Sequence, residues 1–393
     1  MKILHTSDWQ VGKVLKGRDR YDEHAAVLSS IVHIARTEDV DLVLVAGNLF
    51  GTAAPSAKAQ GLVMRTLLAL GEAGRQVIAI AGDHDSPTLL EAVYRPALAP
   101  AGVHVLGTPR RPRRGGLLRL RTRAGEPVNI AALPFLSRRQ AAQAAEALPP
   151  NLAERALDYS SQIAAMVQVL TESFTSDTVN LVMMHARLLG APSSDDQSRL
   201  APDMFPPSTQ YAALGHLHQQ QEIPGPCPIF YCGSPLAMEF EDIQNVSQVL
   251  IVSTELGVRA TTRAVPVTGG RALRTLRGPF DEVIAAGEQD DDAYLRVVLA
   301  ESARPGLGDL VRDKLPNALE VVLDDEHQPE PVDNGGQRVT GVARSPLDVF
   351  GDYVAEQNII DPRLDKLFAE LLVEVAGPAD DAIDPPASAS REA

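Results

Sequence analysis

Cysteine is almost absent from this chain, which has only Cys227 and Cys232 in 393 residues. So few thiols exclude a disulfide-stabilised secreted scaffold and favour a reducing, cytoplasmic compartment. Apolar runs long enough to cross a membrane are also missing, which excludes a membrane-spanning helix. The first residues, KILHT, lead directly into a predicted strand, so we expect no signal peptide.

Positive charge is in deficit, with 36 Lys and Arg against 51 Asp and Glu and a formal net charge of -15. An evenly acidic surface would repel nucleic acid. The exception is an arginine cluster over residues 110–123, where the alternation LRLR predicts a solvent-facing hairpin. Such a cluster either shields a sheet edge or binds phosphates, and the sequence favours neither. The candidate DNA-binding residues are Arg110, Arg111, Arg113 and Arg114.

Five predicted strands each end in side chains that can bind a metal. The apolar run 77–81 stops at Gly82, and the triplet Asp83, His84 and Asp85 follows. The carboxyl ends of parallel strands share one edge of a sheet, where α/β proteins bind ligands. Asp, Asn and His without Cys suit Mn, Fe or Zn bound in pairs for hydrolysis. The other four strand ends carry Asp8 with Gln10, Asn48, His185, and His216 with His218.

A polar cluster without metal would explain any one of these histidines, but not five strand ends together. The alternation of strands and helices over residues 1–110 predicts parallel pairing. Further elements are expected as follows: helices at 23–35, 57–70, 88–98 and 150–171; antiparallel strands at 228–232, 249–253 and 258–264 closing a second sheet; a linker at 265–290; and a small α/β unit at 292–323.

A predicted helix pair at 345–375 carries an apolar stripe near the end of the chain. It either packs back on the main core or docks a helix of a partner. The residues expected to bind that partner are Phe350, Val354, Leu364, Leu367, Phe368 and Leu371.

The motifs HTSDWQVGK, LVLVAGNLF, IAIAGDHDSP, MMHARL and ALGHLHQ resemble the calcineurin-like metallophosphoesterases, and more narrowly the SbcD-type nuclease subunits. The resemblance implies an α/β fold of two packed sheets flanked by helices, with a small capping domain and a C-terminal helix pair. The implied domains are a nuclease domain at 1–265, a capping domain at 266–324, a linker at 325–344, the partner-docking helix pair at 345–376 and a disordered tail at 377–393.

The resemblance also implies a function. A metal-dependent exonuclease and endonuclease would hydrolyse DNA at double-strand ends and hairpins, together with an SbcC-like ATPase. Relatives of this type also allow a homodimer formed through the phosphoesterase domain. The alternatives are a phosphodiesterase acting on a small nucleotide and a catalytically weakened scaffold that binds DNA and the ATPase.

Site roles follow from the resemblance residue by residue. Asp8 and His218 would hold a first metal, and His185 and His216 a second. The position of Asn48 would bridge the two metals. His84 would donate a proton to the phosphate or leaving group, and Asp85 would orient His84.

Three positions depart from the family pattern. Gln10, Asn48 and Asp83 stand where the family has His, the bridging Asp and Asn. A neutral amide bridges two cations poorly, because it offers one uncharged oxygen. Asp83 could bridge in place of Asn48. We therefore expect two divalent ions, with manganese as the first choice, and a first site that binds weakly or is empty.

Overall fold

The structure, a computed structural model, describes residues 1–190, 199–244, 246–289 and 292–324. It also describes Phe350, Val354, Arg363, Leu364, Leu367 and Phe368. The chain divides into two units, Met1–Gln328 and Pro329–Ala393. The predicted connector at 325–344, the tail at 377–393 and Leu371 lie outside the described residues.

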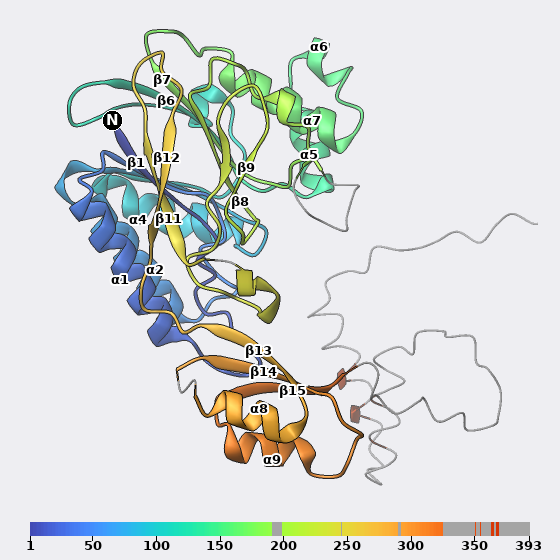
Figure 1. The fold of residues 1–393 in the computed structure, drawn as a ribbon. Coiled ribbons are helices and arrows are strands. Elements are labelled where there is room, and N and C mark those ends of the chain that lie inside the picture. Colours follow the sequence, from blue (N-terminus) through green and yellow to red (C-terminus); the bar gives the residue numbers. More distant parts are fainter. Residues whose placement is uncertain are drawn as a thin grey trace, which may run out of the picture. The chain divides into compact units, whose positions relative to one another are not determined.

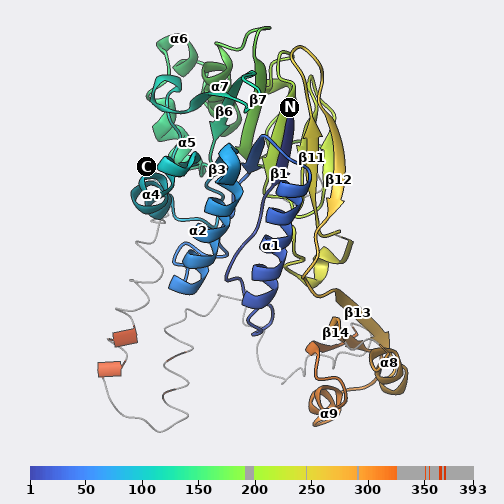
Figure 2. The ribbon, with the colours of Figure 1, turned by 90° about the vertical axis from the view of Figure 1, so that its left-hand side faces the viewer.

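The first sheet has six strands in the order β12-β11-β1-β2-β3-β4 (Figure 1). Four of them run parallel: β1 (Lys2–Thr6), β2 (Leu42–Val45), β3 (Gln76–Ile80) and β4 (Val103–Leu106). The antiparallel strands β11 (Gln248–Ser253) and β12 (Thr261–Pro266) follow beyond β1. Helices α1 (Tyr21–Thr37) and α2 (Ala57–Gly71) connect parallel strands and lie side by side in Figure 2. Both share one apolar core with this sheet.

The second sheet has the order β5-β6-β7-β8-β10-β9. Its strands are β5 (Leu117–Arg121), β6 (Pro127–Leu133), β7 (Val179–His185), β8 (Tyr211–Gly215), β9 (Gln221–Ile223) and β10 (Ile229–Tyr231). Helices α5 (Arg138–Ala145) and α7 (Tyr159–Thr171) pack on its outer face. Side chains such as Ile3, Leu44, Leu181 and Ala213 fill a core between the two sheets. The predicted fold of two packed sheets flanked by helices is confirmed.

The parallel pairing of the strands determines where the polar residues at the strand ends gather. In the first sheet β1, β2 and β3 run side by side in one direction, and in the second β6, β7 and β8 do the same. Successive strand ends within each sheet therefore lie next to one another, which gathers the polar residues that follow them.

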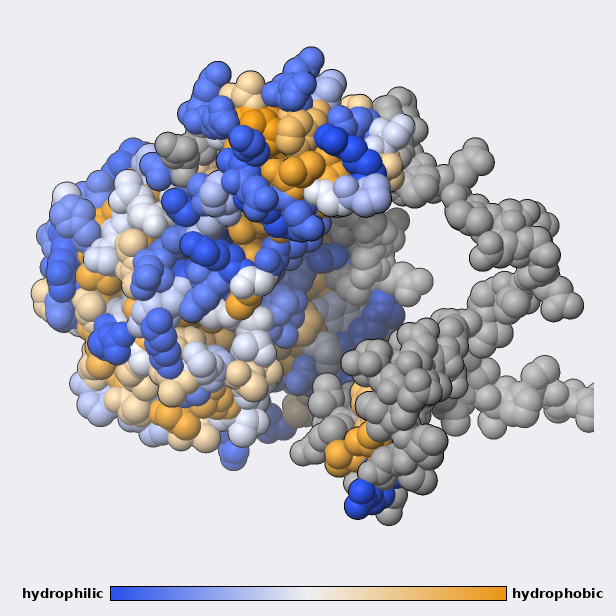
Figure 3. Space-filling view, turned by 90° about the horizontal axis from the view of Figure 1, so that it is seen from below, coloured by the Kyte–Doolittle hydropathy of each residue, from blue (hydrophilic) through white to orange (hydrophobic). Residues whose placement is uncertain are grey.

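A third, smaller sheet forms the α/β unit. Its parallel strands are β13 (Leu273–Gly278), β14 (Tyr294–Leu299) and β15 (Ala318–Leu323), with α8 (Phe280–Gly287) and α9 (Leu307–Lys314). The unit has its own core. It also contacts the rest through an apolar cluster that includes Phe240, Leu273 and Tyr294, and through a Lys16–Glu320 ion pair of 2.8 Å. On the face shown in Figure 3, apolar side chains lie in patches among polar ones.

Several expected elements differ from the structure. Strands β11 and β12 extend the first sheet and not the second, because β11 pairs with β1. The segment expected as a linker at 265–290 contains β13 and α8. The expected helix 150–171 is two helices, α6 (Pro150–Ala153) and α7, because Asp158 caps a new helix start.

The other helical elements of the described residues are short. They are α3 (Pro87–Leu89), η2 (Leu90–Tyr94) and α4 (Arg95–Leu98), which replace one regular helix, and η1 (Glu72–Gly74), η3 (Ala99–Ala101), η4 (Pro112–Arg114), η5 (Pro202–Met204) and η6 (Phe240–Gln244). Among the described residues, none of the helices combines the length and apolar character that crossing a bilayer requires.

Candidate metal centre

The predicted site residues adopt an unusual backbone conformation directly after their strands. Asp8, Gln10 and Asn48 have φ angles of 54°, 45° and 54°, and His216 has 105°. Positive φ is unfavourable for residues with a side chain and is concentrated at functional sites. The sharp turns that these angles produce end each strand and aim the polar groups at the sheet edge.

Two glycines allow the strand ends to approach each other. A Cβ atom on Gly47 would collide with the ring of His185, and one on Gly82 would collide with the side chain of Asn48. Larger residues at either position would therefore push apart the ends of β2, β3 and β7. The glycines that follow these apolar strands are part of the site.

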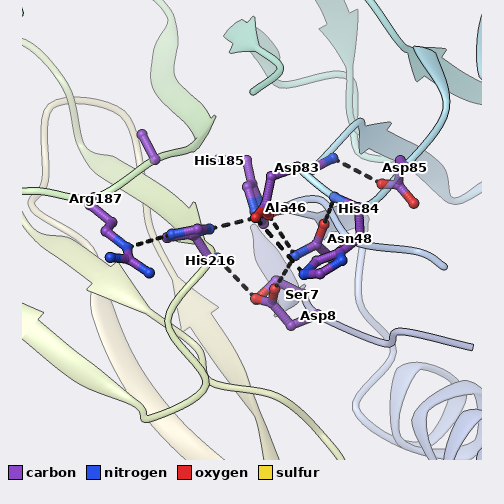
Figure 4. A network of polar contacts seen from close by, with 12 residues as sticks. Ser7, Asp8, Ala46, Asn48, Asp83, His84, Asp85, His185, Arg187 and His216 are labelled. Atoms are coloured by element: carbon purple, nitrogen blue, oxygen red, sulfur yellow. Dashed lines mark hydrogen bonds and ion pairs between the residues drawn. The ribbon is translucent and has the colours of Figure 1, made fainter. Parts of the chain in front are cut away.

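Asp83, His185 and His216 form the best set of metal ligands. Asp83 Oδ1 lies 2.9 Å from His185 Nε2 and 3.2 Å from His216 Nδ1 (Figure 4). The potential ligand atoms of the three residues all lie within 4.8 Å of one another. His185 Nδ1 lies 2.7 Å from the Ala46 carbonyl oxygen, so this nitrogen donates and Nε2 points at the centre. One carboxylate and two imidazoles fit a divalent ion such as Mn, Fe or Zn.

The electrostatics of this set also fit a cation. Burial is the largest single influence on His185 and would lower its pKa, but the hydrogen bond to Asp83, the charges of Asp8 and Asp83 and the Ala46 carbonyl together raise it. Burial would raise the pKa of Asp83, but hydrogen bonds from His185 and His216 bring it well below the usual range. The carboxylate is therefore ionised, and a metal ion would take the place of the protons through which it now bonds the two ring nitrogens.

Asn48 turns its N–H groups toward the same centre. Its Oδ1 accepts the backbone N–H of His84 at 3.0 Å. Its Nδ2 donates to Asp8 Oδ1 at 2.9 Å and to Asp83 Oδ1 at 3.0 Å. A flipped amide would place its oxygen against two carboxylates, so this orientation is the favourable one. Asn48 therefore does not fit the role of a bridging ligand.

The first ligand set is incomplete. Asp8 is fully buried, and its Oδ2 accepts the Ser7 hydroxyl at 2.6 Å and the backbone N–H of His216 at 3.0 Å. Gln10 Nε2 lies 3.1 Å from His218 Nε2, while Gln10 Oε1 is buried and has no hydrogen-bond partner in the described part of the chain. That oxygen could hold a cation. The other Asp8 oxygen, however, is occupied by the Asn48 amide.

The side chains of His84 and Asp85 have different partners. The His84 side chain is 44% exposed, and its Nε2 lies 3.9 Å from Asp83 Oδ2. Asp85 was expected to orient His84, but its carboxylate instead accepts backbone N–H groups of Leu49, Phe50 and Gly82 at 2.9–3.2 Å. Asp85 therefore ties the loops after β2 and β3 together.

Sequence reasoning missed residues that border the centre. Arg187 Nε donates to His216 Nε2 at 2.6 Å, and Asp242 Oδ2 lies 3.1 Å from His218 Nδ1. The ring of Phe135 lies against those of His185 and His216, with centroid distances of 6.2 and 6.4 Å. Phe135 follows β6, which is parallel to β7, so the rule of converging strand ends would have found it. Arg187 follows β7 by two residues, so the same rule would have found it, whereas Asp242 lies on η6 and had no such signal.

Two cavities open beside Asp83, His216 and Arg187. The first has a volume of about 370 Å³ and is also lined by Asn48 and His84. The second has about 240 Å³ and is lined by Phe135, Leu136, Ser137, Arg138, Tyr159 and Ala186 in addition to the shared residues.

The arginine cluster lies on a different groove. Arg110 pairs with Glu91 at 2.6 Å, and Arg111 donates to the Ala147 carbonyl at 3.1 Å. Burial would raise the pKa of Glu91, but Arg110 and Arg95 lower it to about 2. Arg113 and Arg114 are exposed on η4. The cluster borders a groove of about 740 Å³ that shares no lining residue with the cavities at the metal centre.

In the C-terminal unit, the rings of Phe350 and Phe368 stack with centroids 4.0 Å apart and planes 5° apart. These two residues of the predicted helix pair therefore contact each other. Val354 is buried, whereas Leu367 is 51% exposed.

Comparison with known proteins agrees with this architecture. A family profile described as calcineurin-like phosphoesterase matches residues 1–220, and one described as type 5 capsule protein repressor C-terminal domain matches residues 270–358. The chain is 32% identical over 286 residues to the SbcD component of nuclease SbcCD from Bacillus subtilis (strain 168), covering 70% of this chain and 71% of the relative. Identity to the same component is 33% in Rhodobacter capsulatus, covering 73% of this chain and 75% of the relative. It is 26% in Escherichia coli (strain K12), covering 96% of this chain and 99% of the relative.

Proposed function

Because the chain belongs to the calcineurin-like phosphoesterases and, within them, to the SbcD components of SbcCD nucleases, we propose that it hydrolyses phosphodiester bonds of DNA with a divalent metal ion. The observation that carries the proposal is the convergence of Asp83, His185 and His216 at one sheet edge. Double-strand ends and hairpins are the expected substrates, in a cytoplasmic complex.

In this proposal Asp83, His185 and His216 hold the principal ion, for which manganese is the first choice. When bound, the ion supplies Lewis acidity toward a phosphoryl oxygen and activates water. His84 is exposed at the mouth of the cavity and can donate a proton to the leaving oxygen. Ala46 keeps the His185 ring oriented through its carbonyl.

Asp8, Gln10 and His218 would hold a second ion more weakly. The Gln10 Oε1 atom is buried and has no hydrogen-bond partner among the described residues, which supports some affinity for a cation. The Asn48 amide opposes it, because its N–H group occupies the Asp8 oxygen that a bridging arrangement would need.

We assign DNA contact to the arginine cluster, above all to Arg113 and Arg114, because both side chains are exposed. We assign docking of an SbcC-like ATPase to the C-terminal helix pair, where the exposed Leu367 offers an apolar contact. A homodimer through the phosphoesterase domain is also part of the proposal.

The test is a nuclease assay of the full chain with its ATPase partner, ATP and manganese on linear and hairpin duplexes. His84→Ala should lower turnover by roughly 100-fold or more, because a general acid contributes 10²–10⁴-fold. The control is His33→Ala, since His33 is exposed on α1 away from the centre. Equal turnover by His84→Ala and the unsubstituted chain would contradict the proposal.

Metal binding is measured separately from activity. Manganese at 100 times its Kd should stabilise the folded chain by about 2.7 kcal/mol and raise its melting temperature. His185→Ala should abolish that increase, and His33→Ala should retain it. A manganese-dependent increase that survives in His185→Ala would place the ion elsewhere.

A catalytically weakened scaffold is the second candidate, and the N–H groups that Asn48 turns toward Asp8 and Asp83 favour it. DNA and ATPase binding without any manganese-dependent cleavage would support this candidate.

A further inference from the structure

We propose that the cavity between Phe135, Tyr159 and Arg187 binds the unpaired nucleobase of the nucleotide next to the scissile phosphate. This inference rests on the proposed function and names a subsite of the same centre. Its occupant is a flat aromatic base attached to a phosphate.

The lining of the cavity has the shape and chemistry that such a base requires. The cavity has about 240 Å³ and combines two aromatic rings with Arg138 and Arg187. Cavities for drug-sized ligands are larger, at roughly 300–1,000 Å³, so this one suits a single ring system. Rings of the protein bind bases by stacking, and arginine planes contact bases and phosphates.

The aromatic wall of the cavity is held in place before any ligand arrives. Phe135 N donates to the Ala81 carbonyl at 3.0 Å, which ties its backbone to the end of β3. The plane of the Phe135 ring makes an angle of 16° with the plane of the His216 ring. The Tyr159 hydroxyl donates to the Leu136 carbonyl at 3.1 Å, which orients the second ring. A pre-formed wall loses little conformational entropy on binding.

The cavity also lies next to the metal ligands. Asp83, His216 and Arg187 line both this cavity and the cavity at the metal centre. A base in the 240 Å³ cavity would therefore lie beside a phosphate held at the metal ligands. Figure 4 shows Arg187 and His216 pointing toward each other, with His216 between Arg187 and Asp83.

A base that is paired and stacked in a duplex cannot enter such a cavity, because it must first leave the stack. The subsite therefore selects frayed ends, hairpin loops and single strands. Stacking is tolerant of sequence, since every base has a π face. We expect discrimination between unpaired and paired nucleotides, but little discrimination among the four bases.

The test uses the full chain with manganese and the probe 2-aminopurine deoxyriboside 5′-monophosphate, whose fluorescence is quenched on stacking. Phe135→Ala should weaken binding about 5- to 150-fold, as loss of one stacking contact does elsewhere. Deoxyribose 5-phosphate, which has no base, should bind Phe135→Ala and the unsubstituted chain equally. Phe135→Tyr should restore quenching.

The matched control is Phe174→Ala, a similarly half-buried phenylalanine packed on the second sheet away from this cavity. Phe135→Leu keeps an apolar side chain without a ring, and it replaces Phe135→Ala if that variant does not fold. Equal quenching by Phe135→Leu and the unsubstituted chain would overturn the subsite. So would equal affinity of the unsubstituted chain for the probe and for deoxyribose 5-phosphate.

The two proposals fail separately. A chain that cleaves DNA but does not stack the probe overturns the subsite alone. A chain that stacks the probe through Phe135 but does not cleave DNA overturns the nuclease assignment alone.

Discussion

Asn48 Nδ2 lies 3.0 Å from Asp83 Oδ1, so an amide and a carboxylate meet where the family pattern has the same two groups in exchanged positions. The exchange preserves the summed charge but moves the carboxylate toward His185 and His216. The ion held by His185 and His216 thereby gains a carboxylate ligand, and the ion held by Asp8 and His218 loses one.

Reversing the exchange should therefore increase the number of bound ions. In Asn48→Asp combined with Asp83→Asn, a carboxylate regains the position next to Asp8, which can bridge two cations. We expect tightly bound manganese to rise from about one to two ions per chain. Mass spectrometry after gel filtration measures the ratio. Two tightly held ions in the unsubstituted chain would contradict this account of Asn48.

Gly47 should be indispensable for the approach of β2 to β7. Gly47→Ala adds a Cβ that meets the His185 ring at a φ of 97°. Gly74→Ala is the control, because φ is 75° and nothing lies near the added atom. The control should cost about 1–2 kcal/mol of unfolding free energy for positive φ alone. Gly47→Ala should cost roughly 1–3 kcal/mol more. Urea unfolding compares them, and equal costs would mean that the close approach is not rigid.

Stability should fall as the pH drops below 6.5. Burial holds the pKa of His5 at about 3 and that of His24 at about 4. The neutral His5 ring suits its surroundings, because Nδ1 accepts from the Tyr211 hydroxyl and Nε2 donates to the Leu214 carbonyl. As the pH falls, the unfolded chain binds protons before the folded chain does. Each histidine therefore contributes its full stabilisation above pH 6.5 and loses it as the pH falls toward its pKa in the folded chain.

Each of these histidines should lower the unfolding free energy by about 1.4 kcal/mol per pH unit between its two pKa values. Denaturant unfolding from pH 7 to 4.5 measures the slope. His5→Gln should reduce the slope of unfolding free energy against pH by the amount that corresponds to about one proton taken up on unfolding. His33→Ala should leave the slope unchanged. An identical slope in His5→Gln would show that His5 is not neutral in the folded chain.

The exposed arginines should contribute the salt dependence of DNA binding. Replacing Arg113 and Arg114 by Gln should weaken binding and reduce the slope of log K against log salt by up to about 2. The control replaces Arg121 and Arg123, because Arg121 donates to the Gly125 carbonyl and Arg123 pairs with Asp39 and Asp41. An unchanged slope would leave the cluster as a charged sheet edge.

The convergence of site residues was predictable because it follows from the direction of the strands. Asp8, Asn48 and His185 each come immediately after an apolar run, and parallel pairing brings such positions together. The role of Asp85 was not predictable, because backbone N–H groups compete with His84 for its carboxylate. The sequence pattern does not reveal which of these groups the Asp85 carboxylate will bind.

Other misses have different causes. The interruption between α6 and α7 arises where Asp158 forms a capping box with Ser161, a local signal that the apolar periodicity of α7 hid. The sequence of strand β11 does not indicate which sheet the strand joins, because its apolar residues could be buried in either sheet. Its antiparallel pairing with β1 is decided by contacts far apart in the sequence.

The hydrogen bonds from His185 to Ala46 and from Phe135 to Ala81 each connect one sheet to the other. The centre therefore lies between the two layers, with Asp83 following a strand of the first sheet and with His185 and His216 at strand ends of the second. Warming that loosens the packing between the layers will separate the ligands while every strand is still paired with its neighbours. Inactivation should therefore come first, and loss of secondary structure only at higher temperature.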